Sequence, residues 1–527
     1  MTWKRKAVDN VKKIPIWVHI FLVLVLLAEM LFGFTLLTAK IWNTGIVTLF
    51  LKAFAIVNLE IAMFIASVHM YIRFTQAFPI PMRGDRKFKV GFGSIIRGIL
   101  VTFLVLVHFS AIFYDIRLPI QVSGWAYITL LAFAVWMHMV LILLILDLIF
   151  YIMWAVRKCR GNGSLYKLST FVAQYRLFEV LLSIGVSLLF VGYGLYRTLT
   201  PPTIVNEHME TMTLTDQMVN GEPALKELAE EDEDYLLYKE EIAQEEALKS
   251  HPPEEFFFED NEKLRSGATL NIALLSDIHI GPSVGKNRIV NIVEWTNNLE
   301  PDIIAISGDL ADGFVSSLGG AAEPICRLKS KYGVYFATGN HEYFHGNVDE
   351  WFEFLENCNI TVLHNENKRF RTTEGDMVCM AGMDDLVTLS MDMPGHHMDP
   401  VKALKGCQLN DLVVLLAHQP NAAWKVLQDQ KVNGNIDLIM SGHTHNGQVN
   451  FLWPSTEVMN KWNHGLHENK PTHTQVIVSA GVNFFGPPVR TVGVCEIVNM
   501  QIEGRGTPDT SLFEKLHNIV PTELPTH

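Results

Sequence analysis

Five long apolar runs near the N-terminus constrain the fold of this chain more than any other feature. They lie at about 14–38, 46–71, 96–115, 125–155 and 178–196. Each is close to the roughly 20 residues that a helix needs to cross a bilayer. The runs are apolar on all sides, whereas buried helices of a soluble protein show amphipathic stripes. We therefore expect a five-helix transmembrane domain over residues 1–200, and a multi-pass membrane protein.

The charges in the loops predict the orientation of this domain. Sixteen Lys and Arg lie before the first run, between the second and third, and between the fourth and fifth. The other two loops contribute only Lys40 and Arg117. Because Lys and Arg concentrate on the cytoplasmic side, the N-terminus is expected in the cytoplasm. Everything after residue 200 then lies on the exoplasmic side, in an organelle lumen or outside the cell.

Several ionisable residues fall inside the apolar runs, among them Glu29, Glu60, His108, His138 and Asp147. Burying such groups in lipid is costly, so they are expected to face the bundle and pair with one another. Two interpretations stay open. One is a proton or substrate route, and the other is hydrogen bonding between helices that fixes their packing.

An acidic segment separates the apolar runs from the rest of the chain. Residues 201–265 hold 19 Asp and Glu against 5 Lys and Arg, in a chain whose net charge is −13. Such a composition cannot bury enough apolar surface to fold alone, so we expect a flexible linker. Binding of cations or basic partners is the alternative. The acidic balance makes nucleic acid a poor candidate partner.

After the linker, short β-branched runs alternate with helical stretches, a pattern typical of an α/β domain. We place this domain at 266–505 and a C-terminal tail at 506–527. Strands are expected at 270–276, 302–307, 333–338, 411–417, 436–441 and 474–480, and helices at 285–299, 348–358 and 421–428.

Polar motifs follow five of these strands. In chain order they are Asp277-Ile278-His279, Gly308-Asp309-Leu310-Ala311-Asp312, Gly339-Asn340-His341-Glu342, His418-Gln419-Pro420 and Gly442-His443-Thr444-His445. Ligand crevices of open α/β sheets lie beyond the carboxyl ends of the strands, so the five turns should converge. Glycines before Asp309, Asn340 and His443 permit the tight turns that this convergence requires.

The converging side chains form a candidate ligand set for metal. Its members are Asp277, His279, Asp309, Asn340, His418, His443 and His445. Seven N and O donors suit two divalent cations that share a carboxylate, and the lack of cysteine favours Mn, Fe or Zn in a catalytic site. Two such cations would activate a water to attack a phosphoester. His341 is placed to protonate the leaving oxygen.

These motifs resemble those of the calcineurin-like metallophosphoesterases: D-x-H, G-D-x-x-D, G-N-H-E, a lone His and G-H-x-H. Together with the five apolar runs, LLSDIHIGP, GVYFATGNHEY, LLAHQPNAAW and SGHTHNGQ resemble the transmembrane proteins that carry such a domain. The resemblance implies a four-layer α/β/β/α sandwich. Asn446 stands where close relatives commonly have Gly, and we expect only a local change of the turn.

The resemblance also implies a role for each matching residue. One metal would be held by Asp277, His279, Asp309 and His445, and the other by Asp309, Asn340, His418 and His443. His341 would face the substrate as an acid or a phosphate-contacting residue, oriented by Asp312.

Further features of the domain bear on its compartment and its site. Asn359-Ile360-Thr361 is a glycosylation sequon on the predicted exoplasmic side. Cys326 and Cys379 sit in apolar runs typical of buried free thiols. For Arg490, a contact with a phosphate oxygen and a surface or salt-bridged position are equal alternatives. Residues 386–410, rich in His and Met, are expected either to form a loop that sets specificity or to be a plain surface excursion.

The sequence therefore predicts a membrane-anchored two-metal phosphoesterase, a hydrolase acting on a phosphoester that the sequence does not identify. Either the anchor holds the site near a substrate at the membrane, such as a lipid headgroup, or it simply sets the location of the protein. Two alternatives belong to other classes of protein. One is a receptor or scaffold that keeps the metals for structure, and the other is a transporter regulated by its exoplasmic domain. Protein partners are not indicated.

Overall fold

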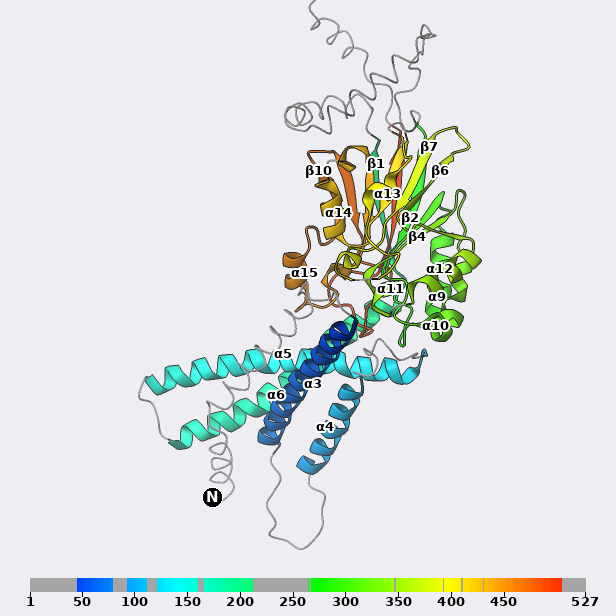
Figure 1. Cartoon of the computed structure of the whole chain (residues 1–527). Coiled ribbons are helices and arrows are strands. Elements are labelled where there is room, and N and C mark those ends of the chain that lie inside the picture. Colours follow the sequence, from blue (N-terminus) through cyan, green and yellow to red (C-terminus); the bar gives the residue numbers. More distant parts are fainter. Residues whose placement is uncertain are drawn as a thin grey trace, which may run out of the picture.

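The computed structural model describes residues 45–78, 92–110, 121–159, 165–211, 264, 267–345, 347–391, 393–408, 411–429 and 431–504. Long helices lie at one end of an α/β domain (Figure 1). The apolar run at 14–38 with Glu29, most of the acidic linker and the tail at 506–527 fall outside the described residues.

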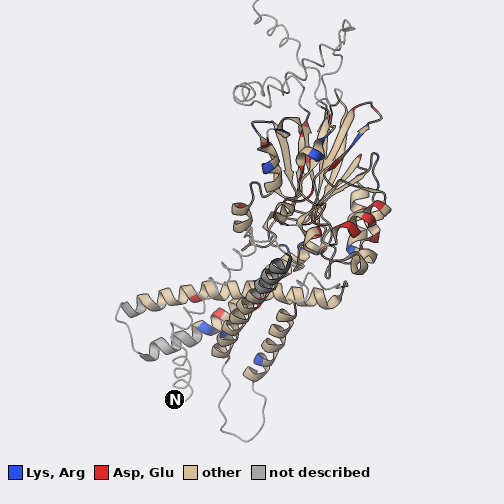
Figure 2. Cartoon of the chain, viewed as in Figure 1, with Lys and Arg blue, Asp and Glu red and all other residues tan. Residues whose placement is uncertain are grey.

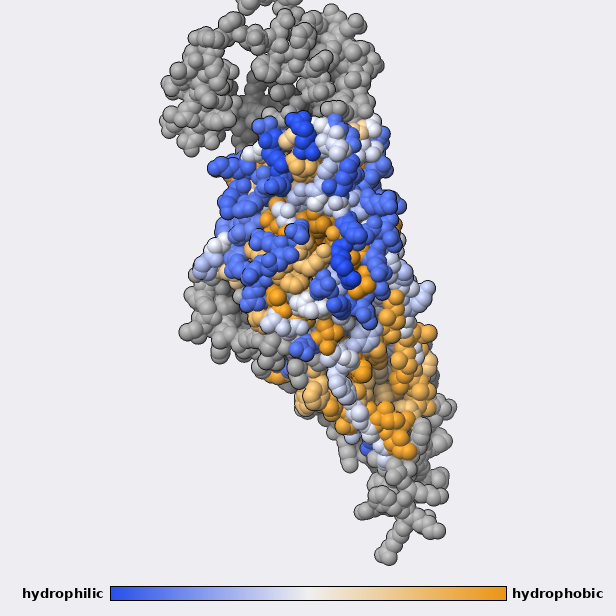
Figure 3. Space-filling view, turned by 90° about the vertical axis from the view of Figure 1, so that its right-hand side faces the viewer, coloured by the Kyte–Doolittle hydropathy of each residue, from blue (hydrophilic) through white to orange (hydrophobic). Residues whose placement is uncertain are grey.

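Four helices occupy the positions of four predicted apolar runs: α3 (Gly45–Ala77), α4 (Phe92–Phe109), α5 (Gly124–Cys159) and α6 (Leu165–Leu199). Two described segments, Gly124–Met153 and Tyr175–Leu199, are long and apolar enough to cross a membrane, and the apolar stretch Gly93–Phe109 is shorter. Figure 3 shows hydrophobic surface gathered on the helices below a largely hydrophilic domain. Two candidate spans among the described residues support membrane helices but do not establish a five-helix domain.

A cluster of buried charges joins three of the helices. Asp147 of α5 accepts hydrogen bonds from Arg73 of α3 at 3.0 Å and from Arg176 of α6 at 2.6 Å. His69 Nε2 lies 2.8 Å from the same carboxylate, and Arg176 also binds Glu179 at 2.6 Å. Few other charged residues lie along these helices (Figure 2). The cluster neutralises its own charge, as burial in an apolar bundle requires.

The placement of Arg73 and Arg176 in the structure corrects the sequence interpretation, which counted both as loop residues. Both lie inside helices because α3 continues to Ala77 and α6 begins at Leu165. Both are buried because Asp147 needs cationic partners. Four other counted residues also lie within helices: Arg97, Arg157, Lys158 and Lys167. The charges outside the described helices still favour one side, by ten Lys and Arg to two.

The remaining ionisable residues of the apolar runs have different partners. Glu60 and His108 pair across α3 and α4 at 3.0 Å, as predicted. His138 instead bonds the carbonyl of Ala134 at 2.8 Å, one turn earlier in its own helix.

The domain is built on two six-stranded sheets. The first has the order β1-β12-β2-β3-β4-β5, from β1 (Thr203–Glu210), β12 (Glu496–Glu503), β2 (Thr269–Leu275), β3 (Ile303–Ser307), β4 (Val334–Ala337) and β5 (Ile360–Val362). The second has the order β10-β11-β9-β8-β7-β6, from β10 (Gly465–Asn469), β11 (Thr474–Val478), β9 (Leu438–Ser441), β8 (Leu412–Leu416), β7 (Met377–Gly382) and β6 (Glu366–Arg371).

Alternation along the strands divides the core into layers. In β2, Leu270, Ile272 and Leu274 face the core between the two sheets, whereas Ala273 and Leu275 face the outer helices. Strand β8 behaves in the same way, with alternate residues in the inner core and in a second outer core. Because side chains point to opposite faces of a strand, one strand serves two cores. The predicted four-layer α/β/β/α sandwich is therefore confirmed.

Helices cover the outer face of each sheet. The first sheet packs against α9 (Lys286–Asn297), α10 (Val315–Ala322) and α12 (Val348–Asn357), and the second against α13 (Pro400–Leu404) and α14 (Pro420–Leu427). Two further helices, α11 (Asn340–His345) and α15 (Trp453–Met459), lie at the end of the domain that faces the long N-terminal helices (Figure 1). All six predicted strands and all three predicted helices are present, with ends shifted by a few residues.

One boundary differs from the prediction. Residues 203–210, which we assigned to the acidic linker, form β1 and pair in parallel with β12 along its whole length. The signal was weak because β1 lies at the sheet edge and is largely exposed, so its sequence does not alternate clearly. The domain thus includes a strand that immediately follows α6.

Two disulfides correct the predicted redox state of the domain. Cys326 pairs with Cys358, and Cys379 with Cys407, with Cα–Cα distances of 4.5 and 5.8 Å. The prediction of free thiols at Cys326 and Cys379 is therefore wrong. The local sequence did not reveal the pairing because the partner cysteines lie 32 and 28 residues away. Cys495 is free and buried.

Candidate metal centre

The candidate site lies where strands of both sheets end. Strands β2, β3 and β4 run parallel in the first sheet, and β8 and β9 run parallel in the second. Each is followed directly by one of the five polar motifs. The carboxyl ends of parallel strands meet at one edge of a sheet, so the motifs are brought together from segments far apart in sequence.

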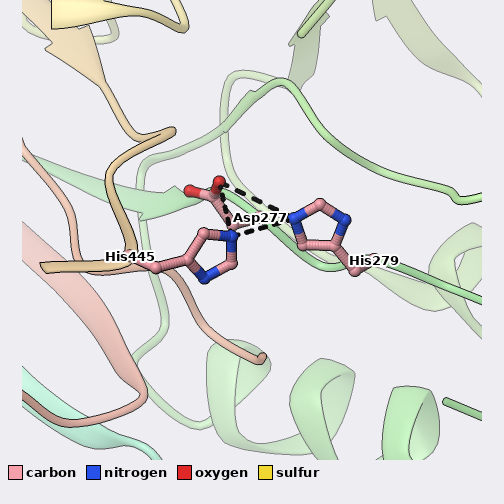
Figure 4. Close-up of side chains that lie close together, drawn as sticks. All are labelled: Asp277, His279 and His445. Atoms are coloured by element: carbon pink, nitrogen blue, oxygen red, sulfur yellow. Dashed lines mark hydrogen bonds and ion pairs between the residues drawn. The ribbon is translucent and has the colours of Figure 1, made fainter. Parts of the chain in front are cut away.

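One group of donors joins the first motif to the fifth (Figure 4). Its members are Asp277, His279 and His445, all buried. His445 Nε2 lies 3.0 Å from His279 Nε2 and 3.3 Å from Asp277 Oδ1. His279 Nε2 lies 3.9 Å from the same Asp277 oxygen. Three potential ligand atoms thus point at one another.

A second group forms beside the first from Asp309, His418 and His443. His418 Nε2 lies 3.1 Å from Asp309 Oδ2. Asn340 joins this group through its side-chain oxygen, 2.8 Å from His443 Nδ1. Asp309 Oδ2 also lies 3.7 Å from His279 Nε2 in the first group. The structure therefore brings together all seven predicted ligands, with the Asp309 carboxylate between the two groups.

Hydrogen bonds behind the site fix the orientation of the imidazoles. His279 Nδ1 and His341 Nδ1 each lie 2.8 Å from the same oxygen of Asp312. His418 Nδ1 lies 2.8 Å from the carbonyl oxygen of Ser307, to which it donates. These contacts leave the Nε2 atoms of His279 and His418 facing inward. A carboxylate or carbonyl behind a histidine is the usual arrangement at metal sites.

The electrostatics of the site follow from burial and close charges. Burial disfavours the charged form of His341, but Asp309 and Asp312 outweigh it and raise the pKa of His341 to about 9. Burial likewise opposes ionisation of Asp312, yet His279 and His341 hold the pKa of Asp312 well below its usual range. For His443, burial and the neighbouring His418 lower the pKa to about 3.

These donors fit divalent cations. His418 Nε2 is buried and makes no hydrogen bond to the described residues, only the ion-pair contact with Asp309. The imidazole nitrogens of His279 and His445 face each other at 3.0 Å, an arrangement that needs a bound cation or a shared proton between them. The set of imidazole, carboxylate and amide donors suits Mn, Fe or Zn.

The backbone of the site is strained in a way that the sequence did not reveal. Five of the seven donors have positive φ: Asp277, His279, Asp309, His443 and His445, at 54°, 48°, 52°, 72° and 50°. Side chains other than glycine rarely adopt this conformation, and it is concentrated at functional sites. Gly308 has φ +74°, and a Cβ there would lie 2.5 Å from the backbone N of Gly339 and 2.6 Å from His418 Nδ1.

Glu342 is a site residue that we did not predict. Its buried carboxylate accepts hydrogen bonds from the backbone N–H groups of Asp309, Leu310, Ala311 and Gly339, at 3.1, 2.8, 3.3 and 2.7 Å. Burial, reinforced by Asp309, raises the pKa of Glu342 to about 7. Glu342 thus holds the turn that carries Asp309. Its position in the G-N-H-E motif is the sequence feature from which this role could have been predicted.

Arg490 fits neither of its predicted alternatives. It is fully buried and donates to the carbonyls of His445, Ala480 and Asn483 at 2.9, 2.6 and 2.8 Å. Arg490 therefore positions His445. Asn446, which stands where relatives commonly have Gly, adopts a left-handed conformation with φ 48°. Asparagine tolerates this conformation better than most residues, so the turn can form without glycine.

The comparisons with known proteins agree with this geometry. Residues 270–447 match the family described as calcineurin-like phosphoesterase. A Caenorhabditis elegans protein named as a metallophosphoesterase is 41% identical over 420 residues, which cover 80% of this chain and 76% of that protein. The chain belongs to the calcineurin-like metallophosphoesterase family.

Two vertebrate relatives carry a more specific name. Proteins called transmembrane protein with metallophosphoesterase domain are 44% identical over 237 residues in Danio rerio and 42% identical over 240 residues in Bos taurus. These matches cover 44% and 45% of this chain, and about half, 53%, of each relative.

Proposed function

We propose that the protein is a membrane-anchored phosphoesterase that uses two divalent cations, with Mn, Fe or Zn as candidates. The observation that carries this proposal is the pair of donor groups that share the Asp309 carboxylate. Asp277, His279, Asp309 and His445 would hold one cation, and Asp309, Asn340, His418 and His443 the other. When bound, such cations neutralise phosphate charge and lower the pKa of a coordinated water.

His341 is proposed as the proton donor to the leaving oxygen. Its ring lies beside both donor groups, with Nε2 4.0 Å from Asp309 Oδ2 and the ring centroid 4.7 Å from that of His279. Asp312 binds His341 Nδ1, so Nε2 is the nitrogen directed at the site. Phe485 packs edge-on against His341 at 4.8 Å and is 38% exposed, so it lies at the rim of the site.

Contacts between the site and the helices support a substrate held near the membrane. The backbone N–H of Arg490 donates to the carbonyl of Gly194 in α6 at 3.1 Å, and Arg490 also binds the carbonyl of His445. Val449 and Val489 pack against Ala134 and Val191 of α5 and α6. The end of the domain that carries the metal donors therefore faces the helices. A phosphoester at the membrane surface, such as a lipid headgroup, would reach it directly.

Two observations support an exoplasmic domain. The sequon residue Asn359 is exposed between α12 and β5, where an oligosaccharyltransferase can reach it. The two disulfides are of the kind that form in oxidising compartments. Both agree with the charge bias of the loops.

The function is tested with the purified full chain in detergent. The full chain is needed because β1 at 203–210 completes the first sheet, so a fragment starting at residue 266 would lack a strand. The protein is stripped with chelator and assayed on a phosphomonoester, a phosphodiester and a phospholipid, with and without restored Mn, Zn or Mg. Metal-dependent turnover is expected. Bound metal without turnover on all three substrates would favour a scaffold.

The topology is tested separately. Asn359→Gln is expected to remove a mass shift that endoglycosidase also removes. An unglycosylated wild-type chain that is cleaved by protease added from the cytoplasmic side would contradict the exoplasmic assignment.

A further inference from the structure

A second cluster of histidine and carboxylate lies outside the site described above. It consists of His364, Asp384 and His396, whose potential ligand atoms all lie within 4.8 Å of one another. His364 Nδ1 lies 2.5 Å from Asp384 Oδ1, and His396 Nδ1 lies 3.8 Å from Asp384 Oδ2. None of the three belongs to the five strand-end motifs that carry the metal donors.

His396 has a free nitrogen directed into this cluster. Its side chain is 4% exposed, and Nδ1 makes no hydrogen bond to the described residues. On the other side of the ring, Nε2 lies 3.3 Å from Asp349 Oδ1 of α12. A proton on Nε2 would face this carboxylate, and Nδ1 would then carry a lone pair that faces Asp384. A carboxylate that orients a histidine in this way is typical of zinc ligands.

The surrounding backbone holds the cluster in place. The side-chain oxygen of Asn365 accepts from the backbone N–H groups of Asp384 and Asp399, at 3.1 and 3.0 Å. Its side-chain nitrogen donates to the carbonyl of His397 at 2.9 Å. Within the His- and Met-rich stretch, His397 and Asp399 are thereby held by Asn365, which positions His396 beside Asp384. The described part of the stretch therefore contributes a side chain to the cluster.

We propose that His364, Asp384 and His396 bind one zinc ion, separate from the two-metal centre. A tetrahedral zinc ion with bonds of about 2.1 Å holds its ligand atoms about 3.4 Å apart. The observed separations of 2.5 and 3.8 Å lie on either side of this value. The side chain of His364 is 28% exposed, so a water can complete the fourth position. Two imidazoles and one carboxylate, without cysteine, suit Zn²⁺.

The zinc ion would link four segments around α11. His364 follows β5, Asp384 follows β7, His396 lies in the stretch after β7, and Asp349 lies in α12. The ring of His396 also packs edge-on against Tyr343 of α11, with centroids 5.4 Å apart. Because α11 carries Asn340 and His341, this site would steady the helix that supplies a donor and the proposed acid.

The test is a count of bound zinc on the purified full chain. Wild type, His364→Gln, His396→Gln and the control His397→Gln are equilibrated with zinc, freed of excess metal and analysed by mass spectrometry. His397 is the control because it is an exposed neighbour of His396 outside the cluster. Both cluster variants should bind about one zinc ion per chain fewer than wild type, and the control should match wild type.

Metal-dependent turnover measured on the same samples shows whether the two-metal centre stays loaded, so one zinc ion lost with turnover retained is assigned to this cluster. Equal zinc content in all four proteins would overturn the proposal. If the cluster variants fail to fold, the zinc affinity of Asp349→Asn is measured instead. This substitution lies on the surface, removes the carboxylate charge beside His396 Nε2 and keeps an oxygen acceptor there. It should weaken zinc binding about 10- to 100-fold at this site. Unchanged affinity in Asp349→Asn would also count against the site.

Discussion

The helices and the domain both bury charged side chains, but they satisfy them differently. In the helices, the Asp147 carboxylate is enclosed by Arg73, Arg176 and His69 at 2.6 to 3.0 Å. In the domain, the Asp309 carboxylate is surrounded by imidazoles, and one of them, His418, keeps a buried nitrogen without a hydrogen bond to the described residues.

The difference separates a structural charge cluster from a binding site. In the helix cluster, opposite charges balance around the Asp147 carboxylate, which accepts from two arginines, and Glu179 Oε1 is a buried atom there without a hydrogen bond to the described residues. The donor groups of the domain are held by contacts behind them, through Asp312, Ser307 and Arg490, and their inner atoms face one another. Buried polar atoms directed at each other without a partner are costly unless a ligand joins them. The following predictions test this comparison.

The largest effect is expected at the shared carboxylate. Asp309→Asn removes the negative charge common to both donor groups and should lower kcat/KM about 10⁴-fold, or about 5.4 kcal/mol, because metal charge stabilisation is worth several kcal/mol. The measurement is turnover of a phosphodiester with saturating metal, with metal content determined in parallel. Glu353→Gln, on the exposed face of α12, is the control. Activity within tenfold of wild type would show that Asp309 is not shared between metals.

A comparable effect, but on stability, is expected in the helices. Asp147→Asn leaves Arg73 and Arg176 buried without their main counter-charge and should destabilise the protein by about 3 to 5 kcal/mol. Thermal unfolding in detergent measures this, while kcat of the folded fraction should stay unchanged. Replacing Asp147, Arg73, Arg176 and Glu179 together by apolar residues should recover most of the stability, because no buried charge is then left unpaired. A quadruple variant as unstable as Asp147→Asn would mean that the cluster does more than neutralise charge.

A smaller effect is expected from the proposed proton donor. His341→Gln should lower kcat about 10²-fold on a substrate with an alkoxide leaving group, because general acid catalysis contributes about 10²- to 10⁴-fold. A nitrophenolate leaving group needs little protonation, so the loss should shrink there. Equal losses on both substrates would assign His341 to phosphate binding instead of proton transfer.

The smallest effect concerns a buried carboxylate with a titratable partner. His464 Nε2 lies 3.0 and 3.1 Å from the oxygens of Glu496, which is buried. The hydrogen bond to Glu496, opposed by burial, raises the pKa of His464. The folded-state pKa then exceeds the unfolded value of about 6.5, so the stabilisation is complete below about pH 6.5. It is lost as the pH rises through the folded-state value.

Screening by solvent limits this contribution to about 1 kcal/mol, because His464 is partly exposed. The stability difference between wild type and His464→Gln should therefore be larger at pH 6 than at pH 9, as measured by thermal unfolding. His473→Gln, in an exposed pair with Glu468, is the control and should show no measurable difference. A gap that widens with rising pH would contradict the assignment.

The elements of the domain were predictable where local pattern and burial agree. Strands such as β3 and β8 are buried on both faces and read as continuous β-branched or aliphatic runs. The edge strand β1 was missed because its exposed residues carry no such pattern. The disulfides were missed because pairing joins cysteines about 30 residues apart, and nothing local records which ones meet.

The sequence by itself determined the α/β alternation of the domain and placed seven candidate donors at strand ends, because motif spacing and strand periodicity are local properties, and the four layers came from the resemblance to a known family. Only the tertiary structure decided how Asp309 lies between the two groups, that Glu342 and Arg490 hold the turns, and that Arg73 and Arg176 lie beside Asp147. The same holds for the cluster of His364, Asp384 and His396. Each of these depends on contacts between distant segments, whose distances and orientations are set by packing and not by spacing along the chain.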